Sequence, residues 1–254
     1  MLFRSKLKLN SDGSISKYKA KLVAKGFHQQ PGIDYTETFS PILKLATIML
    51  VLAIAVNYNW SMRQSDVSNA FIHGYLKEDI YMWQALSYIN SDHPHHVCKL
   101  QKSLYGLKQA PRDWFDRFTS QLLHIGFIAS LADSSLFIYH FSHTIIYLLI
   151  YIDDIIITSN SSAHISNLIQ ALSHTFDLKD LGSLHYFLGI QITPTKYGLY
   201  LKPSMPWIFF IVFMWIMLNP PKHFHILLLD SLLTVILYFL IQLNAEAWLG
   251  LCNI

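Results

Sequence analysis

The sequence has few charged residues and almost no cysteine. Charged residues make up 14% of the 254 residues, against roughly 25% in an ordinary soluble protein. The two cysteines, Cys98 and Cys252, lie too far apart for a Cys-x-x-Cys pair or a disulfide framework, so we expect a reducing compartment. The sequence also lacks a glycine-rich phosphate loop and a His-Arg-Asp catalytic loop, which leaves a kinase without support.

Long apolar runs are absent from the first four-fifths of the chain. Before residue 200 there is no run of eighteen apolar residues, and the first residues lack the apolar segment of a signal peptide. The composition changes near Leu201, because residues 202–254 contain only four charged residues. The sequence therefore predicts a soluble part, 1–201, and an apolar tail, 202–254. Asp230 and Gln242 interrupt the longest apolar stretch of the tail, so a membrane anchor is the weaker interpretation.

What the N-terminal end does contain is positive charge. Seven basic residues precede residue 26, and Asp12 is the only acid among them. They are Arg4, Lys6, Lys8, Lys17, Lys19, Lys21 and Lys25. A segment so uneven in charge is expected to meet phosphate groups, although a merely solvated face is the simpler alternative.

The hydrophobic periodicity predicts helices and antiparallel strands. Apolar residues recur at helical spacing over 111–125, after Pro111, and again over 165–176, behind Ser161 and Ser162. The β-branched and aromatic runs 136–139 and 144–158 predict strands, and the second run breaks at Asp153-Asp154, which predicts a hairpin with two acids at its tip. A further hairpin is predicted from 184–192 to 199–201, with its turn through Pro194 and Gly198. This segregation favours an α+β fold in which helices flank a central antiparallel sheet.

Three carboxylates interrupt segments that otherwise have the composition of buried strands. Asp153 and Asp154 stand between Ile-Tyr-Ile and Ile-Ile-Ile, and Asp66 ends the run 60–67. Clustered like charges need a compensating cation, and oxygen ligands at rigid strand ends suit Mg²⁺, which also binds substrate phosphates. The pattern predicts metal-assisted phosphoryl transfer. A solvent-exposed turn is the alternative for any single Asp-Asp pair.

Five segments in order resemble the conserved motifs of Ty1/copia-type reverse transcriptases of LTR retrotransposons. They are residues 18–27 (YKAKLVAKGF), 66–71 (DVSNAF), 103–112 (SLYGLKQAPR), 151–154 (YIDD) and 187–190 (FLGI). The resemblance covers about residues 15–201 and implies a polymerase fingers-and-palm fragment. It implies RNA-directed DNA synthesis by one module of a Pol polyprotein, whose partners are an RNA or DNA template with its primer, dNTPs and further Pol segments. It also implies an intracellular, cytoplasmic location.

The resemblance also implies roles for single residues. Asp66, Asp153 and Asp154 are the catalytic carboxylates, and with the carbonyl of Val67 they hold two Mg²⁺ ions, or Mn²⁺. Phe71 stands at the position of the gate that excludes a ribose 2′-hydroxyl, which argues against an RNA-copying polymerase. The remaining residues fall into two groups. Lys19, Lys21 and Gln109 are assigned to the incoming dNTP, and Tyr151, Leu188 and Gly189 to the primer.

Some positions depart from the family pattern, and others favour a simple structural role. Lys21 replaces the usual Arg, Asp113 replaces Ala, and residues 85–88 replace a Pro-Pro-Gly-Phe turn. His93, His95, His96 and Cys98 match no zinc spacing and indicate a solvated loop. Trp114, Phe115 and Phe118 have helical spacing, which favours core packing over a nucleic-acid stacking surface.

The apolar tail carries a separate hypothesis. Its permitted codons, read one base earlier, give stretches similar to the family's continuation, so a single-base deletion or a mistaken gene model near Leu201 explains the change in composition. The thumb is then missing or scrambled, and a polymerase without a thumb holds its primer–template duplex weakly. We therefore expect little or no activity from this fragment. The alternative is a non-enzymatic retroelement relic that is associated with membranes through the tail.

Overall fold

The computed structural model describes residues 2–10, 12–195 and 198–203. The chain divides into two compact units, Met1–Leu184 and His185–Ile254. Most of the predicted apolar tail, and with it the frameshift hypothesis, lies outside the described residues. Among the helices of the described part, none is long and apolar enough to cross a membrane.

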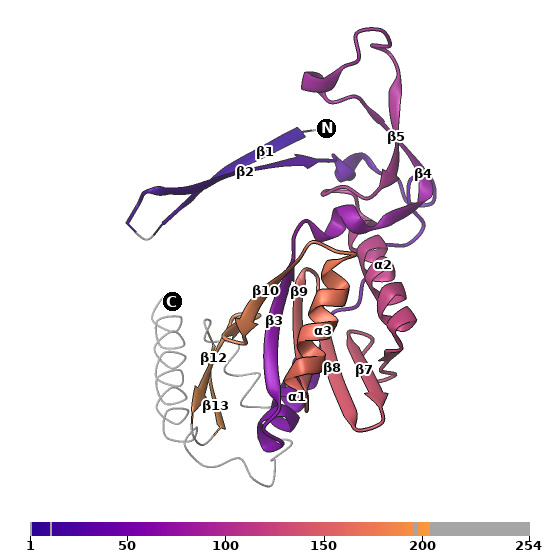
Figure 1. Ribbon diagram of the computed structural model, residues 1–254. Coiled ribbons are helices and arrows are strands. Elements are labelled where there is room, and N and C mark those ends of the chain that lie inside the picture. Colours follow the sequence, from indigo (N-terminus) through magenta and orange to yellow (C-terminus); the bar gives the residue numbers. More distant parts are fainter. Residues whose placement is uncertain (1, 11, 196–197, 204–254) are drawn as a thin grey trace, which may run out of the picture. The chain divides into compact units, whose positions relative to one another are not determined.

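The first unit is built on a six-stranded antiparallel sheet with the strand order β10-β3-β9-β8-β7-β6 (Figure 1). The strands are β3 (Ser61–Val67), β6 (Ile128–Ala129), β7 (Leu136–Phe141), β8 (Thr144–Tyr151), β9 (Asp154–Ser159) and β10 (Leu178–Ser183). The predicted hairpin at 144–158 is confirmed as β8 and β9, and β7 precedes it as a further antiparallel neighbour. The α+β class with an antiparallel sheet is thus confirmed.

Three helices accompany this sheet: α1 (Leu45–Asn57), α2 (Ala110–Ile125) and α3 (Ser162–Ser173). The predicted helices are confirmed as α2, which has Pro111 in its first turn, and α3, which follows Ser161. Trp114 and Phe118 of α2 are buried in one core cluster with α3 and with Ile155 and Ile157 of β9. Core packing of these aromatic residues is therefore confirmed. Since side chains alternate along a strand, Ile156 points to the other face of the sheet, and α1 contacts β9 outside this cluster.

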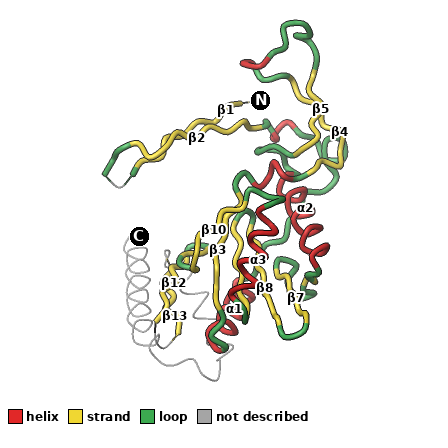
Figure 2. The backbone as a smooth tube through the Cα atoms, viewed as in Figure 1, coloured by secondary structure: helices red, strands yellow, loops and turns green. Residues whose placement is uncertain are grey.

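Two hairpins of the first unit lie outside the main sheet (Figure 2). One pairs β1 (Leu2–Leu9) with β2 (Ile15–Val23), and the other pairs β4 (Tyr75–Trp83) with β5 (Val97–Lys102). Short 3-10 helices η1 (Gly26–His28), η2 (Ala70–His73) and η3 (Leu86–Tyr88) occupy connecting segments. In the loop before β5 the rings of His93 and His96 stack at 4.4 Å, and both backbone carbonyls accept hydrogen bonds from Gln84.

The described part of the second unit is a small antiparallel sheet of β11 (Tyr186–Phe187), β12 (Ile190–Thr195) and β13 (Gly198–Pro203). The hairpin predicted over 184–192 and 199–201 differs in two respects. Its first strand is interrupted at Leu188 and Gly189, which both have positive φ and form a two-residue turn between Phe187 and Ile190. Pro194 lies inside β12, paired with Leu199, rather than in the turn.

Candidate active site

The pairing of β3 with β9 brings the predicted carboxylates to one end of the sheet. Asp66 lies directly opposite Asp154 in the antiparallel register. The next residue along β3, Val67, donates its backbone N–H to the carbonyl oxygen of Asp153 at 2.8 Å. Residues almost ninety positions apart in the sequence are therefore neighbours, because two buried strands pair in this register.

The turn that carries Asp153 is held in an unfavourable conformation. Tyr151 pairs with Asp154, so Ile152 and Asp153 form a two-residue turn. Ile152 has a φ of 57°, which costs a β-branched residue about 1–3 kcal/mol. The indole N–H of Trp114 donates to the carbonyl oxygen of Ile152 at 2.6 Å. Because Trp114 of α2 is buried in the core of the unit, this bond ties the strained turn to that core.

The electrostatics of the cluster reflect its crowding. Burial raises the pKa of Asp66, and the charge of Asp153 raises it further, while Lys179 and Lys19 oppose the shift. Burial also raises the pKa of Asp154, with added repulsion from Asp153 and Asp66. Lys179 faces Asp66 from β10, and its role was not predicted because the polar segment 178–183 has no strand signature. The ionised cluster is thus short of positive charge.

An Asp154→Asn variant is expected to be more stable than the wild-type chain in the absence of divalent cations. A carboxyl group whose pKa is raised by folding favours the folded state at acid pH, and this contribution is lost as pH rises through the raised pKa. At pH 7 the substitution removes the repulsion, and we expect a melting temperature about 2–4 °C higher, which corresponds to about 1 kcal/mol. Thermal melts at pH 7 and pH 3 check this prediction.

The gain should vanish at acid pH, where Asp154 is protonated in both the folded and the unfolded chain. Exposed Asp92, replaced by Asn, is the matched control and should leave the melting temperature unchanged. An equal gain at both pH values would contradict the electrostatic explanation.

The donor chemistry of this cluster fits a hard divalent cation. It offers carboxylate oxygens whose mutual repulsion a cation relieves, together with backbone carbonyls. In the described residues, no group of three or more His, Cys, Asp or Glu side chains is arranged to hold a metal ion by itself. Mg²⁺ sites that act on phosphates commonly use one or two carboxylates and take further ligands from the substrate. Asp66, Asp153 and Asp154 could supply one or two such carboxylates.

The predicted gate residue stands beside an aromatic and cationic wall. Phe71, in η2, has its ring 5.0 Å from the ring of Tyr105. The ammonium nitrogen of Lys21 lies 3.4 Å from the centre of the same Tyr105 ring, a cation–π contact. Lys19 lies two residues before Lys21 on β2, and its positive charge lowers the pKa of Asp66. Tyr105 lies in the motif 103–112, and no role was predicted for it.

Close backbone packing fixes this wall. Ala24 donates its backbone N–H to the carbonyl of Tyr105 at 2.7 Å. A Cβ atom at Gly26 would lie 1.8 Å from the carbonyl oxygen of Gly106, so only glycine permits the approach. A Cβ atom at Gly106, whose φ is +93°, would lie 2.2 Å from the carbonyl oxygen of Ala24. Glycines from two separate motifs are thus required where the base of the β1–β2 hairpin meets the segment before α2.

The other predicted site residues do not all lie beside the carboxylates. Gln109 is fully buried: its side chain accepts from the Gln29 amide at 3.0 Å and donates to the Asp34 carbonyl at 3.2 Å. Tyr151 ends β8 and is partly exposed beside the carboxylates. Leu188 and Gly189 form the turn of the second unit, which is described separately from the first.

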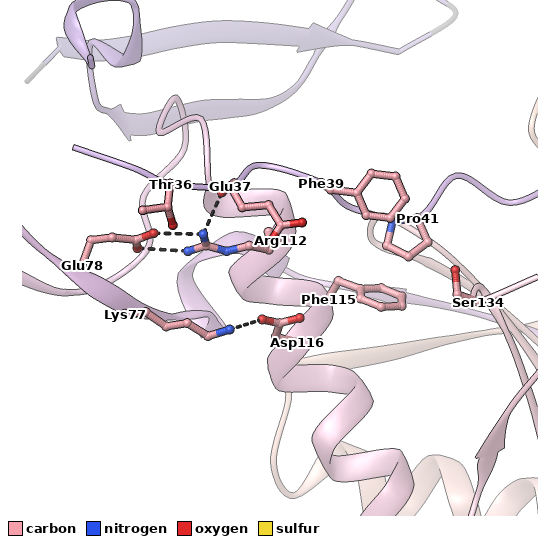
Figure 3. A pocket seen from close by; sticks show the side chains of 10 residues that line it. All are labelled: Thr36, Glu37, Phe39, Pro41, Lys77, Glu78, Arg112, Phe115, Asp116 and Ser134. Atoms are coloured by element: carbon pink, nitrogen blue, oxygen red, sulfur yellow. Dashed lines mark hydrogen bonds and ion pairs between the residues drawn. The ribbon is translucent and has the colours of Figure 1, made fainter. Parts of the chain in front are cut away.

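A buried ionic network adjoins a pocket of about 670 Å³ (Figure 3). Arg112 makes two parallel hydrogen bonds to Glu78, at 2.9 and 3.0 Å, and one to the Glu37 carbonyl at 2.7 Å. It also bonds Asp113, whose other oxygen accepts from Ser103 at 2.5 Å. The pocket contains none of the predicted site residues. It is lined by Thr36, Glu37, Phe39, Pro41, Lys77, Glu78, Arg112, Phe115, Asp116 and Ser134.

This network revises the interpretation of Asp113. The sequence suggests a supporting position that has eroded away from Ala, but Asp113 is 1% exposed and both of its oxygens have partners. A buried carboxylate is tolerated only when it is paired and hydrogen-bonded in this way. Asp113 is therefore an integrated part of the unit.

Comparisons with known proteins add an independent line of observation. A family model described as reverse transcriptase (RNA-dependent DNA polymerase) matches residues 3–205. The chain is 50% identical over 195 residues to the Retrovirus-related Pol polyprotein from transposon RE1 of Arabidopsis thaliana, which covers 77% of this chain and 13% of that relative. It is 42% identical over 188 residues to the corresponding polyprotein from transposon TNT 1-94 of Nicotiana tabacum, covering 74% of this chain and 14% of the relative. The chain thus spans a small part of these curated relatives.

Proposed function

The chain belongs to the reverse transcriptase (RNA-dependent DNA polymerase) family of copia-type Pol polyproteins, and from this premise we propose that it performs template-directed transfer of deoxynucleotides to a primer 3′-hydroxyl. The observation that carries the proposal is the register of β3 and β9, which sets Asp66 opposite Asp154 beside the Ile152-Asp153 turn. We propose that the six-stranded sheet with its helices forms the palm, and that the hairpins β1–β2 and β4–β5 belong to the fingers.

In the proposed reaction the primer 3′-oxygen attacks the α-phosphorus of the nucleotide. A phosphorus–oxygen bond forms, the bond to the bridging β-phosphate oxygen breaks, and pyrophosphate leaves while the hydroxyl proton passes to solvent. The chemistry that divalent cations would supply at this cluster is a lower pKa for the 3′-hydroxyl and neutralisation of the leaving pyrophosphate. Asp66, Asp153, Asp154 and the Val67 carbonyl would hold them. The anchored Ile152-Asp153 turn orients its carboxylate without rearrangement.

The proposed contacts with the nucleotide and the primer follow from where each residue lies. Lys19 and Lys21 are proposed to contact the nucleotide phosphates, because their strand leads to the carboxylates. Tyr151, Leu188 and Gly189 are proposed to contact the primer. Gln109 is proposed to act on the nucleotide through the loop that it holds, since its amide group is already hydrogen-bonded to Gln29 and Asp34.

Primer extension on an RNA template tests the function. The full chain with Mg²⁺ and the four dNTPs should lengthen a labelled DNA primer by the nucleotides that the template specifies. The expectation of weak activity rests on residues 202–254 and stays a prediction, so the reaction is run at enzyme excess. Incorporation that ignores the template sequence would contradict the proposal.

Binding of Mn²⁺ tests the carboxylate site without catalysis. We expect an Asp66→Asn variant to bind Mn²⁺ about tenfold or more weakly than the wild-type chain, because one of its anionic ligands is lost. Electron paramagnetic resonance of free Mn²⁺ in a titration measures the affinity. Asp92→Asn is the control and should bind as the wild-type chain does; equal affinities for all three proteins would remove the site from the proposal.

The gate assignment predicts a change in sugar selectivity. A Phe71→Val chain should use ribonucleotides at least about tenfold better relative to deoxynucleotides, because a smaller side chain leaves room for the 2′-hydroxyl. The ratio of kcat/KM for dCTP and CTP opposite a template guanine measures it. Loss of the contact with Tyr105 alone would slow both nucleotides equally, so an unchanged ratio would refute the gate.

A further inference from the structure

One face of the β1–β2 hairpin is basic over most of its length, from the pair Arg4–Lys21 outward, and the apolar pair Leu2–Val23 ends it at the base. In its antiparallel register three cross-strand pairs are made of two basic residues: Arg4–Lys21, Lys6–Lys19 and Lys8–Lys17. Cross-strand partners share a face, and every second residue of a strand returns to that face. All six positive charges therefore lie on one side of a two-stranded ribbon.

A β-bulge keeps the basic and apolar faces separate. The register shifts after Lys8, so that Leu9 pairs with Ile15 and Ser16 has no partner position. Without the shift, Ile15 would fall on the basic face. The opposite face consists of small and apolar residues, paired as Ser5–Ala20, Leu7–Tyr18 and Leu9–Ile15. This segregation goes beyond the charge excess that the sequence alone reveals.

Such a face is unfavourable unless an anion occupies it. Like charges directly opposite each other destabilise a ribbon, and three such pairs follow one another here. In the described residues none of these six side chains forms an ion pair with an acidic group. Asp12 at the tip is the nearest acid in sequence, and its carboxylate accepts hydrogen bonds from Ser14.

The basic face leads to the proposed active site. At its inner end Lys21 rests on the Tyr105 ring at 3.4 Å, and that ring lies 5.0 Å from the ring of Phe71, in the motif that begins with Asp66. Lys6, Lys8 and Lys17 continue the same face outward, away from the carboxylates. A polyanion that reaches the carboxylates along this ribbon would touch the outer lysines first and the inner ones last.

We propose that Lys6, Lys8 and Lys17 bind the phosphodiester backbone of single-stranded template as it approaches the active site. This inference rests on the proposed polymerase function. Successive pairs on one face are two residues apart, about 6.8 Å, which is close to the separation of phosphates in an extended single strand. The two strands lie about 4.8 Å apart, so the track is wide enough for one backbone and too narrow for the two backbones of a duplex.

Binding of labelled oligouridylate RNA to the full chain tests the inference. The triple variant K6A/K8A/K17A removes facing like charges, so its fold should not be weakened. We expect it to bind about 10- to 100-fold more weakly at low salt, and the slope of log K against log salt to fall by about 2, since each single-strand phosphate contact contributes about 0.7. The control K44A/K77A/K99A removes the same charge from other surfaces and should bind nearly as the wild-type chain does.

The assay contains EDTA and no nucleotide, so it does not depend on catalysis. An Asp153→Asn chain should bind the RNA like the wild type, which separates failure of this inference from failure of the polymerase function. Equal weakening by both triple variants would mean that net charge alone attracts RNA, and would overturn the inference. A larger loss of duplex binding than of single-strand binding in K6A/K8A/K17A would overturn it as well, and so would phosphatidylserine vesicles that displace the RNA.

Discussion

An Asp153→Asn chain is expected to extend an RNA-templated primer about a thousandfold more slowly than the wild-type chain. The substitution removes a negative charge from the turn that faces Asp66 and Asp154, and metal-ion stabilisation of a phosphoryl transition state contributes several kcal/mol. Since 1.36 kcal/mol is a factor of ten in rate, losing about 4 kcal/mol gives this reduction. Single-turnover extension at enzyme excess measures the chemical step without depending on processivity.

Two observations separate loss of chemistry from loss of structure. Asp153 lies in a turn whose backbone is held by Val67 and Trp114, and neither bond involves its side chain. The variant should therefore melt no lower than the wild type, and it should still bind template RNA. Asp92→Asn should extend the primer at the wild-type rate. If Asp153→Asn keeps wild-type incorporation, the assignment of the active site is wrong.

The hairpin that carries Asp153 was predictable from sequence, but the register in which β9 pairs with β3 was not. Two acids inside an isoleucine-rich run are hard to bury, and the simplest structure that keeps them at the surface is a turn between two strands. That Asp66 stands opposite Asp154 depends on which of several antiparallel registers β3 adopts, and a shift of one residue would turn its side chains to the other face. The carboxylate pattern and the family resemblance both predicted that the two segments meet, but neither specified the register.

For the β1–β2 hairpin too, the composition was readable from the sequence and the geometry was not. The excess of lysine before residue 26 was visible in the sequence, but the side on which each lysine lies depends on the pairing and on the bulge after Lys8. β10 was missed because its residues are mostly polar, and it forms by adding to the edge of β3. Strands of this kind are specified by their neighbours more than by their own composition.

The Arg112 network was also invisible to the sequence, because burial of a charge depends on partners that come from distant segments. Glu78 arrives from β4, and the Glu37 carbonyl from the segment before α1. Burial by itself would raise the pKa of Glu78, but the hydrogen bonds from Arg112 outweigh it, and the pKa is lowered overall. The same bonds raise the pKa of Arg112.

An Arg112→Ala variant is expected to lose about 3–5 kcal/mol of unfolding free energy, because it leaves Glu78 and the buried Asp113 without their cation. Urea unfolding at pH 7 measures the loss. A carboxyl group whose pKa is lowered by folding stabilises the fold above its unfolded pKa, and this contribution disappears as pH falls through the lowered value. The difference in unfolding free energy between the wild-type chain and the Arg112→Ala variant should therefore narrow in acid, below the pKa of Glu78.

The matched variant Asp113→Ala should cost less, about 1–3 kcal/mol, since Arg112 keeps both bonds to Glu78 while the Ser103 hydroxyl loses its acceptor. Because the two residues share one network, the double variant should be less destabilised than the sum of the single variants. Strict additivity would mean that Arg112 and Asp113 act independently. In that case the cost of Arg112→Ala would come from the lost packing of its side chain rather than from unpaired carboxylates.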